Sequence, residues 1–391
     1  MSTLRVLAAM SGGVDSGVAA ALLAEAGHAV TGVTLKLWCY GKSPVSPRAC
    51  CTLDAIADAR GVAQKMGFKH FVVEAEDVFR TRVLQPFLDD YAAGRTPYPC
   101  ALCNQHLKFG DLVSRMELIG ADALATGHYA RIEALPDGSS ALLRAVDRSK
   151  DQSYALALIP YAVLQRVRFP LGALEKSAVR EHGRRLGLTL WDKRESMDLC
   201  FVPDGDYAGF MTRNLGETRG TAPGPFLDRD GRRLGTHRGI VHYTVGQRRG
   251  LGLAASEALY VLAVEPERNA VVVGPKRALE APGLVTGQVN WLCASAPAPA
   301  TRVEVMIRAH HPPAAASVHP RADGGAEVRF ENPQSAVTPG QLCVMYQGER
   351  VLGGATIQAA LESSGPAPDA ARDDREAVDS AALAREASPA R

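Results

Sequence analysis

The sequence has no long hydrophobic run. None of its stretches approaches the roughly 18 uncharged apolar residues that a membrane-spanning helix needs. Its first residues, Met1 to Arg5, also lack the charged and apolar regions of a secretory signal. With 391 residues, 46% of them hydrophobic, the chain can bury a large core. We therefore expect a globular, cytoplasmic protein of two or three domains with no membrane partner.

The chain also lacks an excess of charge of either sign. It carries 44 Lys and Arg residues against 42 Asp and Glu residues, which gives a formal net charge of +2. A chain so balanced has no global field that attracts nucleic acid, so any such contact must come from local basic patches. The net charge therefore leaves the class of partner open.

Cysteine is scarce. Eight cysteines are too few for a disulfide framework in a chain of this length, and a reducing cytosol would keep them as thiols. Three stand singly in apolar contexts and are expected to pack as small buried hydrophobes: Cys39, Cys293 and Cys343. The adjacent pair Cys50 and Cys51 is poorly placed to bind one metal ion together and receives no role. Three cysteines in polar segments remain for chemistry: Cys100, Cys103 and Cys200.

The first half of the chain alternates strand and helix patterns. The apolar run at 4–10 predicts a strand, and the Ala- and Leu-rich segment at 17–26 predicts a helix. The same order repeats with strands at 29–38 and 69–74 around a helix at 54–67. Such alternation predicts an α/β fold, a parallel sheet with helices on both faces. A further helix is expected over 78–93 and another buried strand within 121–132.

The second half has a different character. Glycine, proline and short β-branched runs dominate from about residue 210, which predicts small antiparallel β modules. We divide the chain into a catalytic domain (1–209), a central β domain (210–282) and a C-terminal β-barrel or sandwich (283–360). The remaining segment, 361–391, is rich in Ala, Asp, Arg and Pro and is expected to be a disordered tail.

A glycine loop stands between the first strand and the first helix. In SGGVDS, residues 11–16, free backbone N–H groups and the helix dipole create an anion site, and two glycines let the backbone approach a phosphate. The loop lacks the lysine of the Walker motif and the spacing of the dinucleotide fingerprint. It resembles the pyrophosphate loop of ATP pyrophosphatases, which split ATP between the α and β phosphates and adenylate a carbonyl oxygen.

The segment RTPYPCALCNQHLKF, residues 95–109, places Cys100 and Cys103 in a proline-punctuated loop. Such a pair can be a redox dithiol, half of a zinc site, part of a cluster or a nucleophile with its neighbour. A zinc ribbon would need a second C-x-x-C pair, and the sequence has none. The other cysteine in a polar loop is Cys200, in SMDLCFV.

Together these motifs resemble one family. SGGVDS, RTPYPCALCNQHLKF, ATGHYAR, KDQSY, SMDLCFV, YTVGQRRGLG, TPGQ and LGGATI occur in the order of the bacterial and organellar tRNA-specific 2-thiouridylases, over residues 4–358. Argininosuccinate synthases and GMP synthetases share the pyrophosphate loop but are not known to us to combine it with both cysteine segments. The resemblance implies an adenine-nucleotide α-hydrolase-like (HUP, Rossmann-like) catalytic domain, with tRNA as substrate.

The resemblance also implies a reaction. ATP and Mg²⁺ would serve to adenylate the C2 carbonyl of the wobble uridine, position 34, in the anticodon stem-loop of the tRNA, because that oxygen is a poor leaving group. Cys200 matches the persulfide carrier and Cys103 the nucleophile, which would attack the persulfide or form a disulfide as sulfur leaves. Lys108 and Arg131 are candidates to lower the pKa of these thiols. A cysteine desulfurase or a sulfur-relay carrier would supply the sulfur.

The same match assigns binding residues. Those implied for ATP are Ala9, Met10, Ser11, Gly12, Gly13, Val14, Asp15, Ser16, Leu35 and Gly127. Those implied for tRNA are Tyr98, Pro99, Cys100, His128, Lys150, Asp151, Gln152, Arg308 and Gln341. Taken alone, Lys150 and Arg308 would be read as solvated surface charges, and His128 equally well as a histidine that satisfies backbone groups in a buried turn.

The chain departs from the family at two points. Several relatives have Asn-Pro-Asp where this chain has Tyr98, Pro99 and Cys100, and a thiol does not replace a carboxylate in acid–base work. Cys100, Cys103 and Cys200 together could instead hold a [4Fe–4S] cluster with one open iron that delivers sulfide. Residues 309–311 replace the Tyr-Arg-type residues of the basic site.

Two other function classes remain. One is an ATP pyrophosphatase that forms an amide or guanidino product on a small metabolite; it would act without tRNA and tolerate serine at both cysteine positions. The other is an RNA-binding protein with a vestigial nucleotide fold, which would bind RNA without consuming ATP. The paired cysteine segments disfavour the first, and the intact glycine loop disfavours the second.

Overall fold

The computed structural model describes residues 3–37, 53–193, 199–202, 206–216 and 220–362. Cys39, which was expected to pack, and Cys50 and Cys51, which received no role, lie outside these residues, as does the expected tail from 363 onward. Within the described ranges, no helix has both the length and the apolar character needed to cross a membrane.

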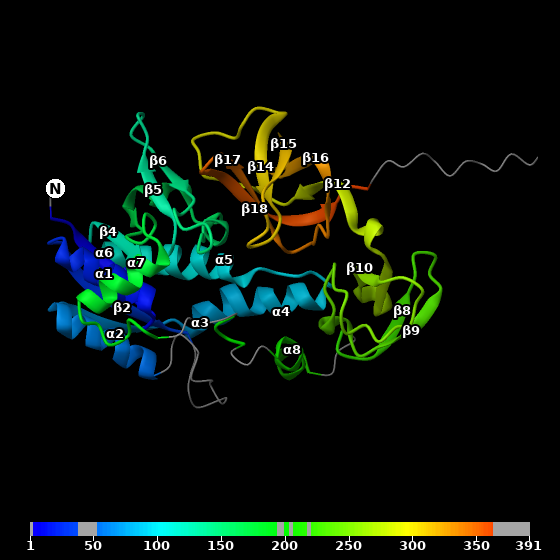
Figure 1. Ribbon diagram of the computed structural model, residues 1–391, viewed down its shortest axis with the longest axis horizontal. Helices are drawn as coiled ribbons and strands as arrows, with labels where there is room; N and C mark the ends of the chain where they lie inside the picture. Colours follow the sequence, from blue (N-terminus) through cyan, green and yellow to red (C-terminus); the bar gives the residue numbers. More distant parts are fainter. Residues whose placement is uncertain (1–2, 38–52, 194–198, 203–205, 217–219, 363–391) are drawn as a thin grey trace, which may run out of the picture. The chain divides into compact units, whose positions relative to one another are not determined.

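A five-stranded parallel sheet forms the first part of the chain, in the order β3-β2-β1-β4-β7 (Figure 1). All neighbouring strands of this sheet run parallel, as the alternating pattern predicted. The strands are β1 (Arg5–Ala9), β2 (Ala29–Lys36), β3 (Lys69–Glu74), β4 (Ala123–Thr126) and β7 (Val167–Arg168).

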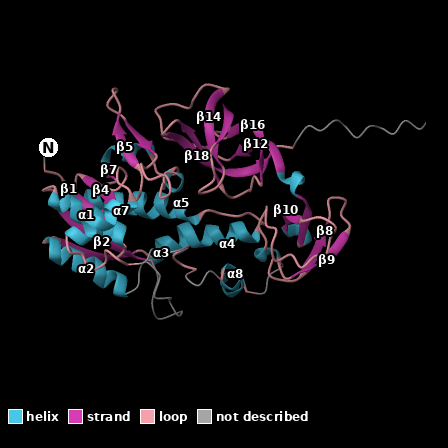
Figure 2. Ribbon diagram, viewed as in Figure 1, coloured by secondary structure: helices cyan, strands magenta, loops and turns pink. Residues whose placement is uncertain are grey.

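Helices cover both faces of the sheet. Successive residues of β1 point to opposite faces, so Val6 and Ala8 pack with α1 (Val14–Glu25), α2 (Leu53–Met66) and α7 (Lys176–Arg185), whereas Leu7 packs with α6 (Leu112–Leu118) and the π-helix η2 (Asn104–Asp111). Figure 2 shows the helices α1, α2 and α7 beside the strands β1, β2 and β4. The expected α/β architecture is confirmed.

The helix expected over 78–93 is built from three segments. These are α3 (Glu76–Phe79), the π-helix η1 (Arg80–Leu84) and α4 (Gln85–Ala92). Phe79, Val83 and Phe87 recur at helical spacing and are almost fully buried. They face a second core region that also receives α8 (Tyr207–Leu215).

The C-x-x-C pair lies on a helix, so its assignment to a loop was wrong. Pro99 opens the helix α5 (Pro99–Cys103), and Cys100 and Cys103 stand one turn apart on it. Proline suits the first turn of a helix because its missing N–H has no intrahelical partner there. The helix continues directly into the π-helix η2.

The central module is a four-stranded sheet in the order β10-β11-β8-β9. Its strands are β8 (Gly224–Leu227), β9 (Arg233–His237), β10 (Leu259–Glu265) and β11 (Ala270–Pro275), with the 3-10 helices η5 (Ile240–His242), η6 (Pro266–Arg268) and η7 (Lys276–Leu279). β8 and β11 pair in parallel, so the expectation of purely antiparallel structure was wrong here. A parallel pair requires the longer crossover that residues 228–269 provide.

The C-terminal module is a closed barrel. Antiparallel pairing runs β12-β16-β15-β14-β17-β18, and β12 pairs with β18 to close it. The strands are β12 (Glu280–Thr286), β13 (Asn290–Trp291), β14 (Thr301–Met306), β15 (Ala314–Pro320), β16 (Ala326–Ser335), β17 (Leu342–Gln347) and β18 (Arg350–Ala360). Cys343 lies in its core as expected, whereas Cys293 is only half-buried.

A hairpin from the first half of the chain joins this barrel. Its strands, β5 (Arg131–Ala134) and β6 (Ser140–Leu143), pair with each other, and Leu143 pairs with Arg350 of β18. Between the hairpin and the parallel sheet run the 3-10 helices η3 (Tyr154–Leu156) and η4 (Tyr161–Arg166). Leu143 and Arg350 are far apart in the sequence, so local pattern could not predict this junction.

Candidate active site

The glycine loop lies where the direction of the sheet changes. β1 lies between β2 on one side and β4 on the other. The loops that follow β1 and β4 therefore lead away in opposite directions from the carboxyl ends of these two strands. Ligands of open α/β sheets bind at this kind of switch point. Residues 11–13 follow β1 and lead into α1, as the sequence predicted.

At two positions in this region a neighbouring stretch of backbone comes so close that only glycine fits. Gly12 adopts φ +71°, and a Cβ there would stand 2.1 Å from the carbonyl oxygen of Ala55. Gly127, which follows β4, lies against the start of α1, where a Cβ would come within 2.6 Å of the backbone nitrogen of Ser16. Gly13 has extended backbone, and a Cβ there would meet only the Ser11 hydroxyl, at an ordinary contact distance of 3.6 Å. The structure thus brings Gly127 to the loop, as the match implied.

Serine hydroxyls shape the loop from within. The hydroxyl of Ser16 accepts the backbone N–H of Ser11 at 3.0 Å and lies 3.1 Å from the Ser11 hydroxyl. It also donates to the carbonyl of Gly13 at 3.3 Å. These contacts hold the turn around residues 11–13, with the N-terminus of α1 behind it, in the arrangement that favours an anion.

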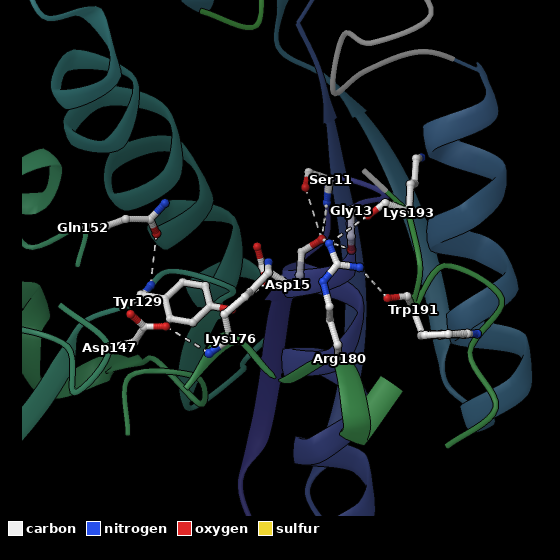
Figure 3. A network of polar contacts seen from close by, with 11 residues as sticks. Ser11, Gly13, Asp15, Tyr129, Asp147, Gln152, Lys176, Arg180, Trp191 and Lys193 are labelled. Atoms are coloured by element: carbon white, nitrogen blue, oxygen red, sulfur yellow. Dashed lines mark hydrogen bonds and ion pairs between the residues drawn. The ribbon is translucent and has the colours of Figure 1, made fainter. Parts of the chain in front are cut away.

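The carboxylate of Asp15 is the centre of a polar network (Figure 3). It accepts hydrogen bonds from the hydroxyl of Tyr129 at 2.8 Å and from the ammonium of Lys176 at 2.6 Å. The backbone N–H of Lys176 donates to Asp147, and the backbone N–H of Tyr129 donates to the side chain of Gln152. The network therefore fixes a paired negative and positive charge beside the loop.

A second lysine holds the other side of the loop. The ammonium of Lys193 donates to the carbonyl of Gly12 at 3.0 Å and to the carboxylate of Asp58 at 2.6 Å. Arg180 donates to the carbonyls of Trp191 and Lys193, so α7 fastens the segment that leads toward Cys200 (Figure 3). Sequence reasoning missed these lysines and Tyr129; Lys193 stands seven residues before Cys200, which was its only signal.

The residues matched to the adenosine site lie next to the loop. Met10 is fastened to β2 by its backbone N–H, which donates to Val33, and by its carbonyl, which accepts the hydroxyl of Thr34 at 2.7 Å. Leu35 on β2 is half-buried between two core regions. Ala9, Met10 and Leu35 thus occupy the same sheet edge as the loop.

The two cysteines of α5 are half-buried. Burial raises the pKa of Cys100 to about 11, with a further rise from the neighbouring Cys103 and an opposing effect from Lys108. Burial also raises the pKa of Cys103, again opposed by the positive charge of Lys108. For Cys103 the expected effect of Lys108 is therefore present, although the pKa is raised overall.

Arg131 does not act on these thiols, so that expectation was wrong. Its guanidinium forms an ion pair with Glu349 on the barrel and donates to the carbonyl of Arg144 at 2.8 Å. The side chain therefore joins the β5–β6 hairpin to the barrel.

The segment around Cys200 packs on aromatic residues. The ring of Phe201 contacts the rings of Phe79, Phe87 and Phe210 at centroid separations of 5.6, 5.2 and 5.5 Å. Leu199, Phe201 and Cys103 all pack against the same hydrophobic region, formed by α3, α4 and α8. The residues on either side of Cys200, and Cys103 itself, therefore pack against the same hydrophobic cluster.

The residues matched to tRNA divide into separate groups. Tyr98 contacts the ring of Tyr154 at 5.2 Å, and Gln341 donates to the carbonyl of Thr96 at 2.9 Å. Tyr98 and Gln341 therefore meet at the N-terminus of α5. Pro99 is buried in the first turn of α5, beside Cys100.

A second group surrounds the loop after β6. Asp151 accepts the backbone N–H groups of Ala145 and Ser153, and Gln152 holds Tyr129, so both side chains fasten the backbone. Lys150 is half-buried beside them. Arg308 lies in the loop after β14, where its carbonyl accepts the backbone N–H of His311. Burial, with the charge of Arg308 second, lowers the pKa of His311.

His128 lies between β4 and the π-helix η2. Its Nε2 stands 3.3 Å from the ammonium of Lys108, and its Nδ1 stands 2.5 Å from the hydroxyl of Thr126. Burial, with Lys108 second, keeps the pKa of His128 well below its usual range. His128 thus connects the end of β4, next to Gly127, with the helix of the cysteines.

Metal-ligand geometry is absent from the part of the chain that the structure describes. No three Cys, His, Asp or Glu side chains come together there in an arrangement that could hold a metal ion. Cys100, Cys103 and Cys200 are all described, so their placement does not fit a three-cysteine cluster.

Three family models match the chain. A "tRNA methyl transferase HUP domain" matches residues 4–204, a "tRNA methyl transferase PRC-barrel domain" residues 212–275, and an "Aminomethyltransferase beta-barrel domain" residues 282–357. The first alone covers about half of the chain.

Curated relatives match almost end to end. A protein of Geobacter metallireducens named tRNA-specific 2-thiouridylase MnmA is 47% identical over 91% of this chain and 97% of its own length. The protein of the same name from Magnetococcus marinus is 47% identical over 90% of this chain and 98% of its own. That of Geotalea uraniireducens is 44% identical over 92% and 96%.

Proposed function

This chain belongs to the tRNA-specific 2-thiouridylase family, and we propose that it thiolates C2 of the wobble uridine of tRNA at the expense of ATP. The proposal depends most on one observation: a short series of contacts links the glycine loop to the helix that carries Cys100 and Cys103. Gly127 lies against Ser16, and the next residue, His128, contacts Lys108 on the helix that carries Cys103.

In the first step the loop at 11–16 binds the phosphates of ATP. Backbone N–H groups and the N-terminus of α1 face the anion, and the absence of a side chain at Gly13 leaves room for it. Asp15, with Lys176 as its counter-charge, is the carboxylate suited to hold Mg²⁺, which would neutralise charge on the departing pyrophosphate. The C2 oxygen of uridine thereby becomes an AMP ester.

In the second step sulfur passes from a persulfide on Cys200. The thiolate of Cys103 attacks the inner sulfur of that persulfide, forms a Cys103–Cys200 disulfide and displaces hydrosulfide. The hydrosulfide adds to C2 and expels AMP. The two cysteine sulfurs are oxidised as the outer sulfur is reduced, so no other oxidant is needed; a dithiol reductant then restores both thiols. Their shared packing against one hydrophobic region supports this exchange.

The modules divide this work in our proposal. Residues 1–209 bind ATP and carry both cysteines, while 210–282 and 283–360 hold the tRNA, with 361–391 as a tail. Tyr98, Pro99, His128 and Gln341 are the candidates nearest to the cysteine helix. A cysteine desulfurase or relay carrier loads Cys200 in the cytoplasm, where a reducing thiol pool is available.

A [4Fe–4S] mechanism is the second candidate, because Cys100 stands where relatives have aspartate. The described arrangement of Cys100, Cys103 and Cys200 disfavours it. Anaerobic purification followed by iron and acid-labile sulfide assays separates the two, since the persulfide route requires neither. About four irons per chain, lost together in the Cys100→Ser variant, would establish the cluster.

The function is tested by mass spectrometry of tRNA nucleosides after incubation with ATP, Mg²⁺ and a sulfur donor. Wild-type protein should form 2-thiouridine only when ATP and tRNA are present, and the Cys200→Ala variant should form none. Cys293→Ala is the matched control, because that thiol lies on the barrel. Thiouridine formed equally by Cys200→Ala would refute the carrier role, and ATP turnover without tRNA would support the metabolite-directed alternative.

A further inference from the structure

The glycine loop carries no cation of its own. Residues 11–16 include one charged side chain, and it is the carboxylate of Asp15. The loop of the Walker motif, by contrast, contains the lysine that reaches the β and γ phosphates. Backbone N–H groups and a helix N-terminus offer an anion only partial positive charges. A triphosphate bound at this loop therefore needs cations from other parts of the chain.

Lys176 and Lys193 both reach the loop, and the charge of Lys176 is already balanced. Its ammonium lies 2.6 Å from the carboxylate of Asp15 and 5.6 Å from the centre of the Tyr129 ring. The side chain of Lys176 is only 13% exposed, whereas that of Lys193 is 41% exposed. Lys193 is therefore the more accessible of these two cations for a ligand.

Lys193 contacts the backbone of the loop itself. Its ammonium donates to the carbonyl of Gly12 at 3.0 Å and to the carboxylate of Asp58 on α2 at 2.6 Å. An ammonium has three N–H donors, and among the described residues these contacts use two of them. The carboxylate of Asp58 is 33% exposed, and ion pairs this open to solvent contribute little to stability. A phosphate at the loop can therefore compete for this ammonium.

The backbone that carries Lys193 is held in place by two helices. Arg180 of α7 donates to the carbonyls of Trp191 and Lys193 at 2.9 and 3.3 Å (Figure 3). Leu190 is 3% exposed and packs on α1 at Gly17, where a Cβ would stand 3.1 Å from the leucine side chain. The ammonium is thus presented to the loop by an ordered segment, which reduces the entropy lost when a ligand binds.

We propose that Lys193 is a phosphate-binding residue whose ammonium contacts the β and γ phosphates of ATP and the pyrophosphate released from them. Gly12, which it contacts, belongs to the loop assigned to the pyrophosphate, not to the residues matched to adenosine. The inference rests on the proposed function for the cleavage of ATP at this bond. The binding of pyrophosphate itself requires neither tRNA nor sulfur.

The test compares the binding of inorganic pyrophosphate, ATP and AMP, each with Mg²⁺, by isothermal titration calorimetry of the full-length protein. Lys193→Met should raise the dissociation constants of pyrophosphate and ATP about tenfold, the loss of one charge-assisted hydrogen bond, and leave that of AMP unchanged. Lys193→Arg should keep most of the affinity. Lys65→Met, an exposed lysine of α2, is the matched control and should bind all three ligands as the wild type does.

Asp58→Asn separates phosphate binding from a bracing of the loop against α2. The amide keeps the size of the side chain and removes the competing negative charge, so pyrophosphate should bind as tightly as in the wild type or more tightly. Equal weakening of pyrophosphate binding in Asp58→Asn and Lys193→Met would overturn the proposal. So would an unchanged pyrophosphate affinity in Lys193→Met, or an equal loss of AMP and pyrophosphate binding in that variant.

A measurement on the wild type decides the matter if Lys193→Met fails to fold. Lysine side chains are acetylated with N-hydroxysuccinimidyl acetate, and the labelled peptides are quantified by mass spectrometry. Pyrophosphate with Mg²⁺ should slow the labelling of Lys193 several-fold and leave that of Lys65 unchanged, and AMP should protect neither. Equal labelling of Lys193 with and without pyrophosphate, or equal protection by AMP, would contradict the assignment.

Thiouridine formation by the same preparation tests the function separately. Wild-type protein in which pyrophosphate protects Lys193 but which forms no thiouridine would refute the function and leave the role of Lys193 intact. Thiouridine formation by protein in which pyrophosphate leaves Lys193 unprotected would do the reverse.

Discussion

The ammonium of Lys176 lies 2.6 Å from the carboxylate of Asp15, although 161 residues separate them in the chain. The pair connects the first turn of α1 with the first turn of α7, and the hydroxyl of Tyr129 completes it from the loop after β4. The glycine loop is therefore supported by segments that lie on both sides of the sheet's switch point.

Removing this counter-charge should weaken ATP binding. In Lys176→Met the carboxylate of Asp15 would keep the Tyr129 hydroxyl but lose its positive partner. Measured without Mg²⁺, its repulsion of the phosphates should raise the dissociation constant of ATP about tenfold, equivalent to about 1.4 kcal/mol. Isothermal titration calorimetry measures this, with Lys69→Met, an exposed lysine of β3, as control. An unchanged affinity in Lys176→Met would contradict the assigned charge balance.

The two loop glycines should respond differently to alanine. Gly12→Ala forces a Cβ into the carbonyl of Ala55 at a positive φ, so the thermal midpoint of unfolding should fall by several degrees. Gly13→Ala meets no such clash and should unfold like wild type. ATP affinity should nevertheless fall at least tenfold in Gly13→Ala, because its methyl group would occupy the approach of the phosphate. Equal ATP affinity in Gly13→Ala and wild type would rule out this site.

Gln341 should act through the segment before the cysteine helix. Its amide donates to the carbonyl of Thr96, so Gln341→Ala should increase hydrogen exchange of the backbone over 95–103. Gln347→Ala, an exposed glutamine of the same barrel, serves as control. If exchange over 95–103 stays at the wild-type level while tRNA affinity falls, Gln341 contacts tRNA directly rather than through this segment.

Stability should decrease in acid because buried histidines are held neutral. His237 donates from Nε2 to the carbonyl of Asn269 and accepts the N–H of Gly239 on Nδ1, and burial lowers its pKa. Below a pH of about 6.5 the unfolded chain therefore binds more protons than the folded one, and each such histidine costs up to about 1.4 kcal/mol per pH unit. This contribution is fully present above that pH and is lost as the pH falls.

Thermal unfolding between pH 5 and pH 7.5 measures the effect. The midpoint should fall toward pH 5 in the wild type, and less steeply in His237→Gln, which starts lower but has one fewer group to protonate. Parallel curves for the two proteins would show that His237 does not contribute. His310 is exposed, so His310→Gln is the matched control.

The sequence predicted the elements that local pattern controls. The strand at 5–9, the glycine loop and the helix from 14 followed from an apolar run, paired glycines and an Ala-rich segment. By contrast, prolines at 97 and 99 suggested a loop, yet Pro99 opens a helix because the first turn needs no N–H there. The direction of pairing between β8 and β11 was not predictable either, since an apolar strand pattern does not encode its partner.

The site was predicted in its loop and its cysteines but not in its supports. Lys176 and Tyr129 reach Asp15 across 161 and 114 residues, and only the fold brings such positions together. The π-helical winding of η2 was equally hidden, because its sequence carries no proline or glycine break before Gly110. Long-range pairing and helix register are set by packing, which a single sequence does not display.

The central claim is that the thiols of Cys103 and Cys200 exchange sulfur at a site served by the glycine loop. A single turnover without reductant tests it: protein loaded with persulfide on Cys200 is mixed with ATP, Mg²⁺ and tRNA, and peptides and nucleosides are quantified together. We expect one Cys103–Cys200 disulfide for each 2-thiouridine formed, and neither product without ATP. Thiouridine formed in full yield while both cysteines remain reduced would contradict it.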